Sequence, residues 1–358
     1  MHNTSTTREH VIFPAPLFQA RGPVSAQLLA ALTLPDDRGE AVLESFHETV
    51  GLALDSTTDI VRDDDLQLTL FVLHGLHYGS VVECDGRWEW HPRLIAERTR
   101  IEAAFEAALR ERVPVPELPE ATVEAVAAAL FELTGAESGP SLSKYVAAKA
   151  TREQLIEMVV QRSIYTLKEA DPHSWGIPRL TGRAKAALVE IQADEYGGGR
   201  PDRVHATIFA RTMRGMGLDD TYGTYVDNVP AITLASLTMM SMFGLNRRLR
   251  GAIAGHLAAF EMTSSIPNGL YARGFRRNGY GDDVTEYFDE HVEADAVHEQ
   301  IAGRDLAGAL AEDDPRLLAD IMFGASACIT VDGWAAQHQL ERFLAGESSL
   351  RRLIEVSA

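Results

Sequence analysis

Hydrophobic residues recur at helical spacing along most of this sequence, while the alternation of apolar and polar residues that marks strands is scarce. Residues 94–109 show the pattern well, because charged residues fill the face opposite the apolar one. The apolar positions there are Leu94, Ile95, Ile101, Ala104, Phe105 and Leu109. With 46% hydrophobic residues the chain can bury a sizeable core. The pattern therefore predicts an all-α fold.

A proline-spaced segment at residues 113–119 interrupts the helical pattern and predicts a linker. It separates an N-terminal helical part, residues 1–112, from a longer helical part, residues 120–345. No motif in residues 1–112 indicates chemistry. We expect this part to extend the helical bundle or to form the interface of a homodimer.

Side chains that cap helices place several helix starts. Asp63 is spaced to cap a helix that runs to about Gly75. Thr151 and Gln154 have the spacing of a capping box at the start of another helix. The helices predicted in the longer part cover residues 121–133, 151–170, 182–196, 229–243, 247–264, 283–300 and 315–345.

The charge and cysteine content exclude several classes of protein. Acidic residues outnumber basic ones by 52 to 33, and the formal charge of −19 disfavours nucleic acid as a partner. Cys84 and Cys328 are too few for a disulfide framework and predict free thiols in a reducing cytoplasm. Residues 1–19 lack the pattern of a signal peptide, and the apolar stretch Ala231–Leu245 is shorter than a membrane span. We therefore expect a cytoplasmic protein with no membrane segment.

The segment His291-x-x-x-Asp295-x-x-His298 places three metal-binding residue types at positions i, i+4 and i+7. On a helix these positions share one stripe, so the three side chains point into one volume. The neighbouring residues are also acidic, and a solvated acidic face is the alternative interpretation.

A second motif, Asp202-x-x-His205, pairs a carboxylate with an imidazole at i and i+3. Di-iron helical bundles use a carboxylate-x-x-His pair of this kind on their ligand helices. Pro201 suits the first turn of a helix that carries both residues. Glu195 would share their face if the helix were continuous, but the glycines at 197–199 either break it or form a bulge that redirects Glu195. Asp202 could instead serve only the helix start.

Two further glutamates are candidate ligands. Glu169 lies at the end of the preceding predicted helix, and Glu261 lies within an otherwise apolar helix, where a buried carboxylate needs a partner. Imidazoles and carboxylates without sulfur form a hard donor set that suits iron or manganese rather than structural zinc. The set is too large for a single ion with open positions and fits two.

These motifs, with the strings Leu167-Lys-Glu-Ala-Asp-Pro-His-Ser-Trp-Gly-Ile-Pro and Ile191-Gln-Ala-Asp-Glu-Tyr-Gly-Gly-Gly-Arg, resemble the haem-oxygenase-like di-iron (dimetal) oxidases, in particular their iron-containing redox enzyme branch. The likeness spans roughly residues 120–345. It implies a haem-oxygenase-like seven-helix bundle, here with an N-terminal helical extension. It also implies two Fe(II)/Fe(III) ions and O₂ as a co-substrate.

The resemblance assigns the metal ligands as Glu169, Glu195, Asp202, His205, His291, Asp295 and His298. Asp202 departs from the glutamate that is frequent in the family, and Glu261 competes with Glu195 as the fourth strong carboxylate. Lys168 and His173 adjoin Glu169 and could support the ligands.

The activity that the resemblance implies is oxidation of a small amine, amino acid or aliphatic carboxylate, by N-oxygenation, desaturation or oxidative C–C cleavage. Residues that could meet the substrate are Arg273, Arg276, Met240 and Phe243, although exposed arginines and core packing are the plainer interpretations. Two alternatives stay open: a haem- or cofactor-binding helical protein, and a helical interaction module without enzymatic activity.

Overall fold

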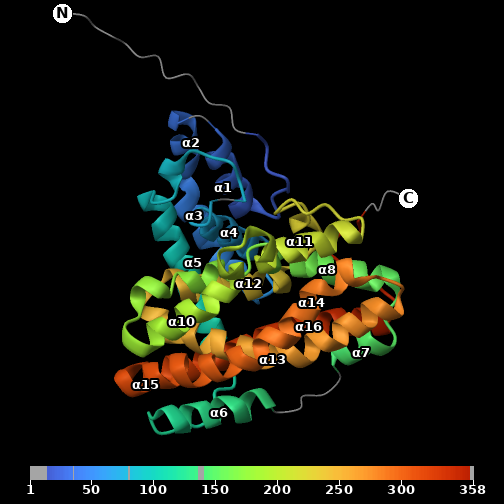
Figure 1. Cartoon of the computed structure of the whole chain (residues 1–358). Helices are drawn as coiled ribbons and strands as arrows, with labels where there is room; N and C mark the ends of the chain where they lie inside the picture. The colour runs from blue at the N-terminus through green and yellow to red at the C-terminus, as the bar shows by residue number, and fades with distance from the viewer. Residues whose placement is uncertain (1–13, 35, 80, 136–140, 355–358) are drawn as a thin grey trace, which may run out of the picture. The chain divides into compact units, whose positions relative to one another are not determined.

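The structure, a computed structural model, describes residues 14–34, 36–79, 81–135 and 141–354, and every regular element in these ranges is a helix (Figure 1). The all-α prediction is therefore confirmed. The chain forms two compact units, Met1–Ala104 and Phe105–Ala358. Their division falls inside helix α5 (Pro92–Arg112), before the proline-spaced segment at residues 113–119.

The N-terminal unit contains the helices α1 (Pro23–Thr33), α2 (Asp36–Val42), α3 (Phe46–Ser56), α4 (Asp64–Gly75) and the first part of α5. Asp63 caps α4 as predicted, because its carboxylate accepts hydrogen bonds from the backbone N–H groups of Asp65 and Leu66. The core of the N-terminal unit is formed by buried apolar side chains such as Leu28, Leu32 and Leu66.

The C-terminal unit contains the rest of α5 and a set of helices that form most of the molecule. They are α6 (Val123–Gly135), α7 (Leu142–Ala148), α8 (Arg152–Thr166), α9 (Asp171–Ser174), α10 (Gly182–Glu195), α11 (His205–Gly215), α12 (Ala231–Leu245), α13 (Arg250–Arg277), α14 (Asp282–Gln300), α15 (Ala309–Asp313) and α16 (Leu318–Leu344). The predicted capping box of Thr151 and Gln154 is present at the start of α8.

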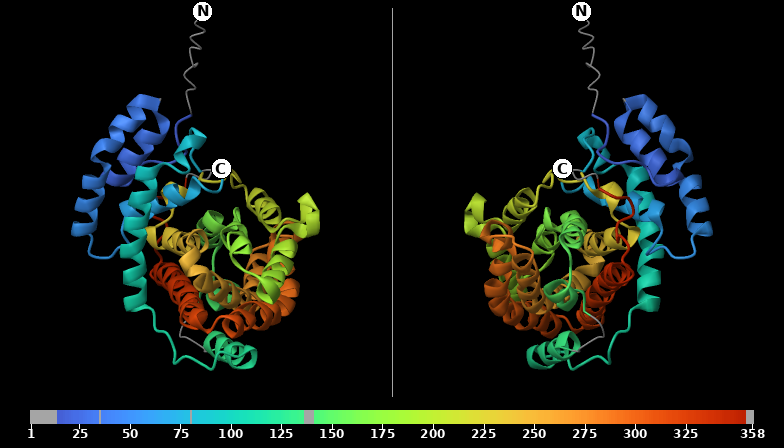
Figure 2. Two further views of the ribbon diagram at one scale, coloured as in Figure 1. Left: turned by 90° about the vertical axis from the view of Figure 1, so that its left-hand side faces the viewer. Right: turned by 90° about the vertical axis from the view of Figure 1, so that its right-hand side faces the viewer.

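Helices α13, α14 and α16 lie side by side along the unit, as Figures 1 and 2 show from different directions. Glycines bring α13 and α16 into backbone contact. A Cβ atom on Gly255 would lie 1.9 Å from the carbonyl oxygen of Ile321, and one on Gly324 would lie 2.0 Å from that of Ala252. Any larger residue at either position would force the two helices apart.

Two predicted helix ends differ from the structure. The helix predicted at 151–170 ends at Thr166, because the chain turns at Ala170, which has a left-handed backbone with φ of 71°. The helix predicted to end at residue 264 instead continues to Arg277 with Pro267 inside it. Packing of α13 against α14 and α16 accompanies the continuation of the helix past Pro267.

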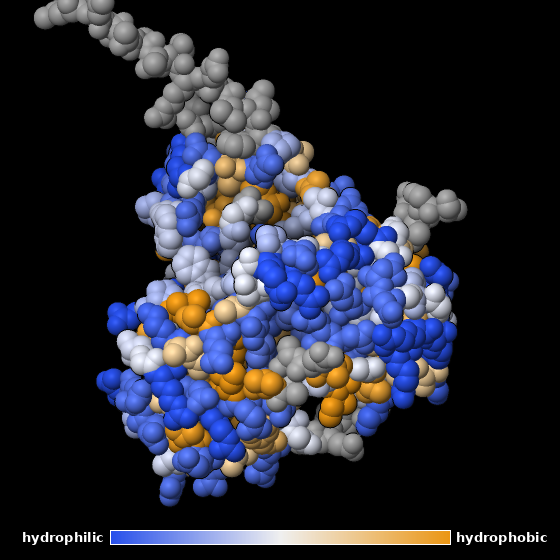
Figure 3. All heavy atoms as spheres, viewed as in Figure 1, coloured by the Kyte–Doolittle hydropathy of each residue, from blue (hydrophilic) through white to orange (hydrophobic). Residues whose placement is uncertain are grey.

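The segment Pro315–Leu344, which includes α16, is long and apolar enough to cross a membrane by length and composition alone. However, 61% of its most apolar window is buried within the protein, as expected of a core helix. Helix α12, the predicted apolar stretch, is shorter and largely buried. On the face seen in Figure 3, hydrophilic residues predominate and apolar residues form scattered patches.

Candidate metal centre

Glu169 is positioned by the sharp turn that follows α8. Ala170 adopts φ of 71°, a conformation that costs a residue with a Cβ about 1–2 kcal/mol. The side chain of Gln192 fixes this turn, because its amide donates a hydrogen bond of 2.8 Å to the Ala170 carbonyl oxygen. The carboxylate of Glu169 is thereby held inside the unit, with only 5% of the residue exposed.

Glu195 and His205 are brought together by the glycine segment 197–199. Glu195 is the last residue of α10, and all three glycines have positive φ. A Cβ on Gly197 would lie 2.6 Å from the carbonyl carbon of Arg203, so the chain can fold back only with glycine there. Helix α11 then begins at His205, whose Nδ1 lies 2.9 Å from Oε2 of Glu195.

The prediction that Asp202 and His205 share one helical face is wrong. Asp202 belongs to the short 3₁₀ turn Pro201–Arg203, which precedes α11, and its side chain is exposed to solvent. The cause is the glycine segment, which ends α10 and delays the next helix until His205. The structure therefore does not bring Asp202 to the buried cluster.

His291 and Glu169 meet across α14 and the turn after α8. Nε2 of His291 lies 3.5 Å from Oε1 of Glu169. Nδ1 of His291 lies 2.7 Å from the carbonyl oxygen of Tyr287, so this nitrogen donates its proton there and Nε2 is the ring nitrogen that faces Glu169. The hydroxyl of Tyr287 donates a 2.7 Å hydrogen bond to Oε1 of the same glutamate.

His298 lies two turns after His291 on the same stripe of α14, between two carboxylates. Its Nδ1 is 3.3 Å from Oε2 of Glu261 on α13, and its Nε2 is 3.1 Å from Oδ2 of Asp194 on α10. Glu261 and His298 are buried, whereas Asp194 is largely exposed. Asp194 thus contacts the solvent-facing Nε2 of the imidazole, and Glu261 faces its Nδ1 inside the unit.

The donors form two overlapping groups within 4.8 Å: Glu169, Glu195, His205 and His291 in one, and Glu195, Glu261 and His298 in the other. Glu195 belongs to both groups, so the structure brings Glu195 and Glu261 together. We call these residues the metal cluster.

Several buried atoms of the metal cluster have no hydrogen-bond partner. They are Oε2 of Glu169, Nδ1 of His205 and Nδ1 of His298. Carboxylate oxygens lie near the two nitrogens, but not in hydrogen-bond geometry. Buried polar atoms are normally satisfied, so this convergence fits metal ions as the missing partner. Among the described residues, the ion partners of the three glutamates are imidazoles, not lysine or arginine.

The cluster titrates as a set of carboxylate–imidazole pairs. Burial lowers the pKa of His298, but Glu261 and Asp194 outweigh this and raise it to about 9. Burial likewise opposes the raised pKa of His205, which Glu195 causes. Burial and the charge of Glu195 raise the pKa of Glu261. These imidazoles therefore hold protons that a bound cation would displace.

Asp295 lies on α14 between the two histidines, but its side chain is outside the described residues. Lys168 points elsewhere, since its ammonium lies 3.9 Å from Asp171 and against the ring of Tyr222. His173 is buried beside the cluster, and its Nε2 lies 3.1 Å from Nδ1 of His256. Burial, and then the proximity of His256, hold the pKa of His173 well below its usual value.

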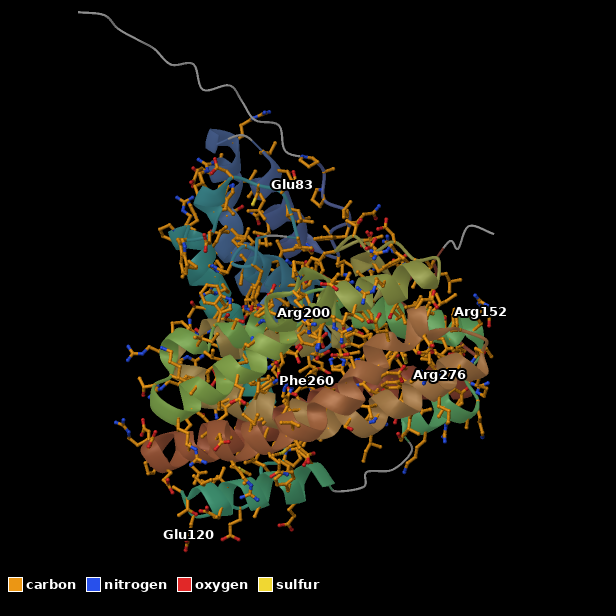
Figure 4. All side chains as sticks on the ribbon, in the orientation of Figure 1. Glu83, Glu120, Arg152, Arg200, Phe260 and Arg276 are labelled. Atoms are coloured by element: carbon orange, nitrogen blue, oxygen red, sulfur yellow. The ribbon has the colours of Figure 1, made fainter. Side chains whose placement is uncertain are left out.

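The four residues predicted to meet a substrate divide into two pairs. Arg273 and Arg276 are exposed, and Arg276 pairs with Asp289 at the C-terminal end of α13, away from Phe260 in Figure 4. Met240 and Phe243 are buried on α12. Met240 lines a cavity described below, whereas Phe243 packs edge-on against Phe323.

Sequence reasoning missed two residues that contact the metal cluster. Tyr287 lies one helical turn before His291, and that i, i+4 spacing could have revealed it. Asp194 lies directly before Glu195, yet nothing in the sequence shows that it faces His298. A cavity of about 10 Å³, lined by Glu169, Glu195, Glu261, His291 and His173 among others, adjoins the cluster.

Comparison with known proteins agrees with this centre. Residues 156–333 match the family model described as iron-containing redox enzyme. A nitrosourea synthase from Streptomyces achromogenes subsp. streptozoticus is 30% identical over 180 residues, which are 50% of this chain and 38% of that enzyme. The chain thus spans well under half of that relative's length.

The matched region contains α8 to most of α16 and includes all of the residues of the metal cluster. The buried carboxylates and imidazoles are compatible with the iron that the family description names. By this match, residues 156–333 belong to the iron-containing redox enzyme family, with a haem-oxygenase-like fold.

Proposed function

We propose that this protein is a non-haem di-iron oxidoreductase that uses O₂ to oxidise a small amine, amino acid or aliphatic carboxylate. The observation that carries the proposal is the convergence of Glu169, Glu195 and Glu261 with three buried imidazoles, without a lysine or arginine ion partner among the described residues. Such a group of buried charges needs cations.

The division of donors supports two ions rather than one. Glu169, His205 and His291 would hold one iron, and Glu261 and His298 the other, with Glu195 between them. Iron pairs held by carboxylates and imidazoles supply the activation of dioxygen. The chain's own residues orient the ligands: Tyr287 holds Glu169, and Asp194 holds His298.

The relative favours nitrogen as the oxidised atom. It is named for making a nitrosourea, a group that contains an oxidised nitrogen. Because the chain spans only 38% of that enzyme, we propose oxidation of a nitrogen-bearing substrate and not the same product. The cavity of about 10 Å³ at the cluster also disfavours haem as the cofactor.

The test is anaerobic reconstitution with Fe(II), followed by metal analysis and then by O₂ uptake. We expect about two iron ions per chain in the wild-type protein and about one in each of His291→Ala and His298→Ala. His47→Ala is the matched control, because His47 is an exposed histidine of the N-terminal unit and should not change the iron content.

Two results would overturn the proposal. One is wild-type protein that takes up neither iron nor manganese. The other is an iron content that stays unchanged in both His291→Ala and His298→Ala. A Soret band after incubation with haem, together with no uptake of free iron, would favour the haem-binding alternative.

A further inference from the structure

A second cavity, of about 260 Å³, lies in the C-terminal unit between α8, α12, α13 and α16. Tyr165, Phe260 and Ser264 line this cavity and also the small cavity at the metal cluster. The two spaces therefore share a wall of three side chains. Phe260, labelled in Figure 4, lies on α13 and is half-buried.

Arg162 on α8 supplies the positive charge of this second cavity. Its guanidinium lies against aromatic rings, with its centre 5.5 Å from the ring of Tyr271 and 6.0 Å from that of Tyr287. It forms no ion pair with a described carboxylate, and its buried Nε donates no hydrogen bond. The charges of Glu169 and Asp332 stabilise the guanidinium without forming an ion pair with it, so its Nε can still bind a carboxylate ligand.

The groups of this cavity that accept hydrogen bonds come from α16 and α13. Asp332 and Gln339 are seven residues apart on α16 and so lie on one face of the helix. Asp332 accepts a 2.6 Å hydrogen bond from Ser236 and has no lysine or arginine ion partner among the described residues. Oε1 of Gln339 and Oδ1 of Asn268 are buried without a hydrogen-bond partner.

Burial raises the pKa of Asp332, and the hydrogen bond from Ser236 and the charge of Arg162 only partly oppose this rise. The cavity thus contains a guanidinium whose Nε has no hydrogen-bond partner and three oxygen groups that can accept hydrogen bonds. An ammonium group carries three N–H donors, and a carboxylate matches a guanidinium. A molecule with both groups would satisfy the whole set.

We propose that this cavity binds an aliphatic amino acid as the substrate, with its carboxylate on Arg162 and its ammonium group on Asp332, Asn268 and Gln339. The remaining wall is apolar and includes Leu142, Met158, Leu237 and Met240, which suits an aliphatic side chain. The volume lies below that of pockets for drug-sized ligands, so the amino acid is small. The inference rests on the proposed function, because the metal cluster beyond the shared wall would perform the oxidation.

The experiment is calorimetric titration of the full-length protein, loaded with Fe(II) and kept under nitrogen so that no turnover occurs. The probes are L-valine, L-leucine, L-norleucine and L-methionine, each with its amine analogue that lacks the carboxylate and its acid analogue that lacks the amine. We expect at least one amino acid to bind, and both of its analogues to bind about 10- to 100-fold more weakly.

Variants assign the two ends of the ligand. Arg162→Gln should weaken binding of the amino acid by about 10- to 100-fold and leave the affinity for the amine analogue unchanged. Asp332→Asn should weaken binding of the amino acid and leave the affinity for the acid analogue unchanged. Arg162→Lys should restore part of the affinity, since it keeps the charge but loses the planar fork. A purely structural role would lower the melting temperature without this selectivity.

The inference is overturned if none of the amino acids binds to iron-loaded protein. It is also overturned if Arg162→Gln and Asp332→Asn weaken both analogues equally. Metal analysis of each variant separates this failure from that of the proposed function. Amino acid binding by a protein that takes up no iron would refute the di-iron proposal and leave the cavity assignment standing.

Discussion

Each unit of this protein contains a buried group of histidines and glutamates, and the two groups differ in the source of their positive charge. In the N-terminal unit, Nε2 of His74 lies 2.8 Å from Oε1 of Glu102, and Nε of Arg98 lies 3.4 Å from the same oxygen. His77 contacts Arg98. A single buried carboxylate is therefore balanced by a guanidinium from the protein itself.

The metal cluster of the C-terminal unit has the same residue types but a different balance. Three glutamates converge there, and among the described residues their ion partners are only imidazoles. Burying several carboxylates together costs free energy that imidazoles alone offset only while they hold protons. The difference teaches that a buried His–Glu contact does not by itself indicate a metal site. The excess of carboxylates over fixed cations does.

The sharpest test of this difference is a matched pair of substitutions, Glu195→Gln and Glu102→Gln. Glu195 belongs to both groups of donors, so its loss should remove nearly all iron. Glu102 is also buried but is balanced by Arg98, and the Glu102→Gln protein should keep the wild-type iron content. Metal analysis after Fe(II) reconstitution is the measurement. Equal iron loss in the two variants would show that both effects arise from unfolding.

In the metal-free protein, the Glu102→Gln substitution should have the larger effect of the two on the free energy of unfolding. Glu102→Gln removes the partner of a buried guanidinium and should cost about 3 kcal/mol of the free energy of unfolding. Glu195→Gln removes a charge that destabilises ionised Glu261, so its cost should be within about 1 kcal/mol. Urea unfolding of both variants without metal measures this. A larger cost for Glu195→Gln would contradict the comparison.

Tyr287 allows a milder change at the metal cluster. Tyr287→Phe removes the 2.7 Å hydrogen bond to Glu169 and leaves the ring against His291. Loss of a group that orients a ligand typically weakens metal affinity about 10- to 100-fold. Competition for Fe(II) with a chelator would measure the change. Tyr225→Phe is the control, because the Tyr225 hydroxyl instead accepts from the backbone N–H of Asp219.

The buried histidines of the N-terminal unit should make the stability of the protein depend on pH. Burial, with the charge of Arg98, lowers the pKa of His77 from 6.5 to about 4. Between these values the unfolded chain binds a proton that the folded chain does not, so stability should fall as the pH drops from 6.5 to 4. His77→Gln should flatten this part of the curve of unfolding free energy against pH. An unchanged slope would mean that His77 is already protonated in the folded protein.

The sequence predicted the helical class and much of the metal cluster for physical reasons that are local. Helical spacing on α14 aligns His291 and His298 wherever the helix packs, so that prediction needed no tertiary information. Glu261 was recognisable because a carboxylate in an apolar helix needs a partner. Caps such as Asp63 were equally local.

The rest depended on the backbone between helices and on packing. The direction of Glu195 is set by the positive φ angles at residues 197–199, and three glycines in a row permit many paths. Arg162 was not recognised, because its spacing resembles that of any helical arginine and only the packed unit shows that it lines a cavity with its Nε unpartnered. Contacts of this kind arise from the tertiary fold.

Asp202 supplies the smallest expected effect and separates the sequence motif from the structure. Asp202 is three residues from His205, yet it is exposed in the 3₁₀ turn Pro201–Arg203 while His205 is buried. Asp202→Ala should therefore leave the iron content unchanged, whereas His205→Ala should lower it. Metal analysis of the two variants decides the point. Iron loss in Asp202→Ala would mean that the segment after the glycines rearranges on metal binding and carries the carboxylate inward, as the motif first predicted.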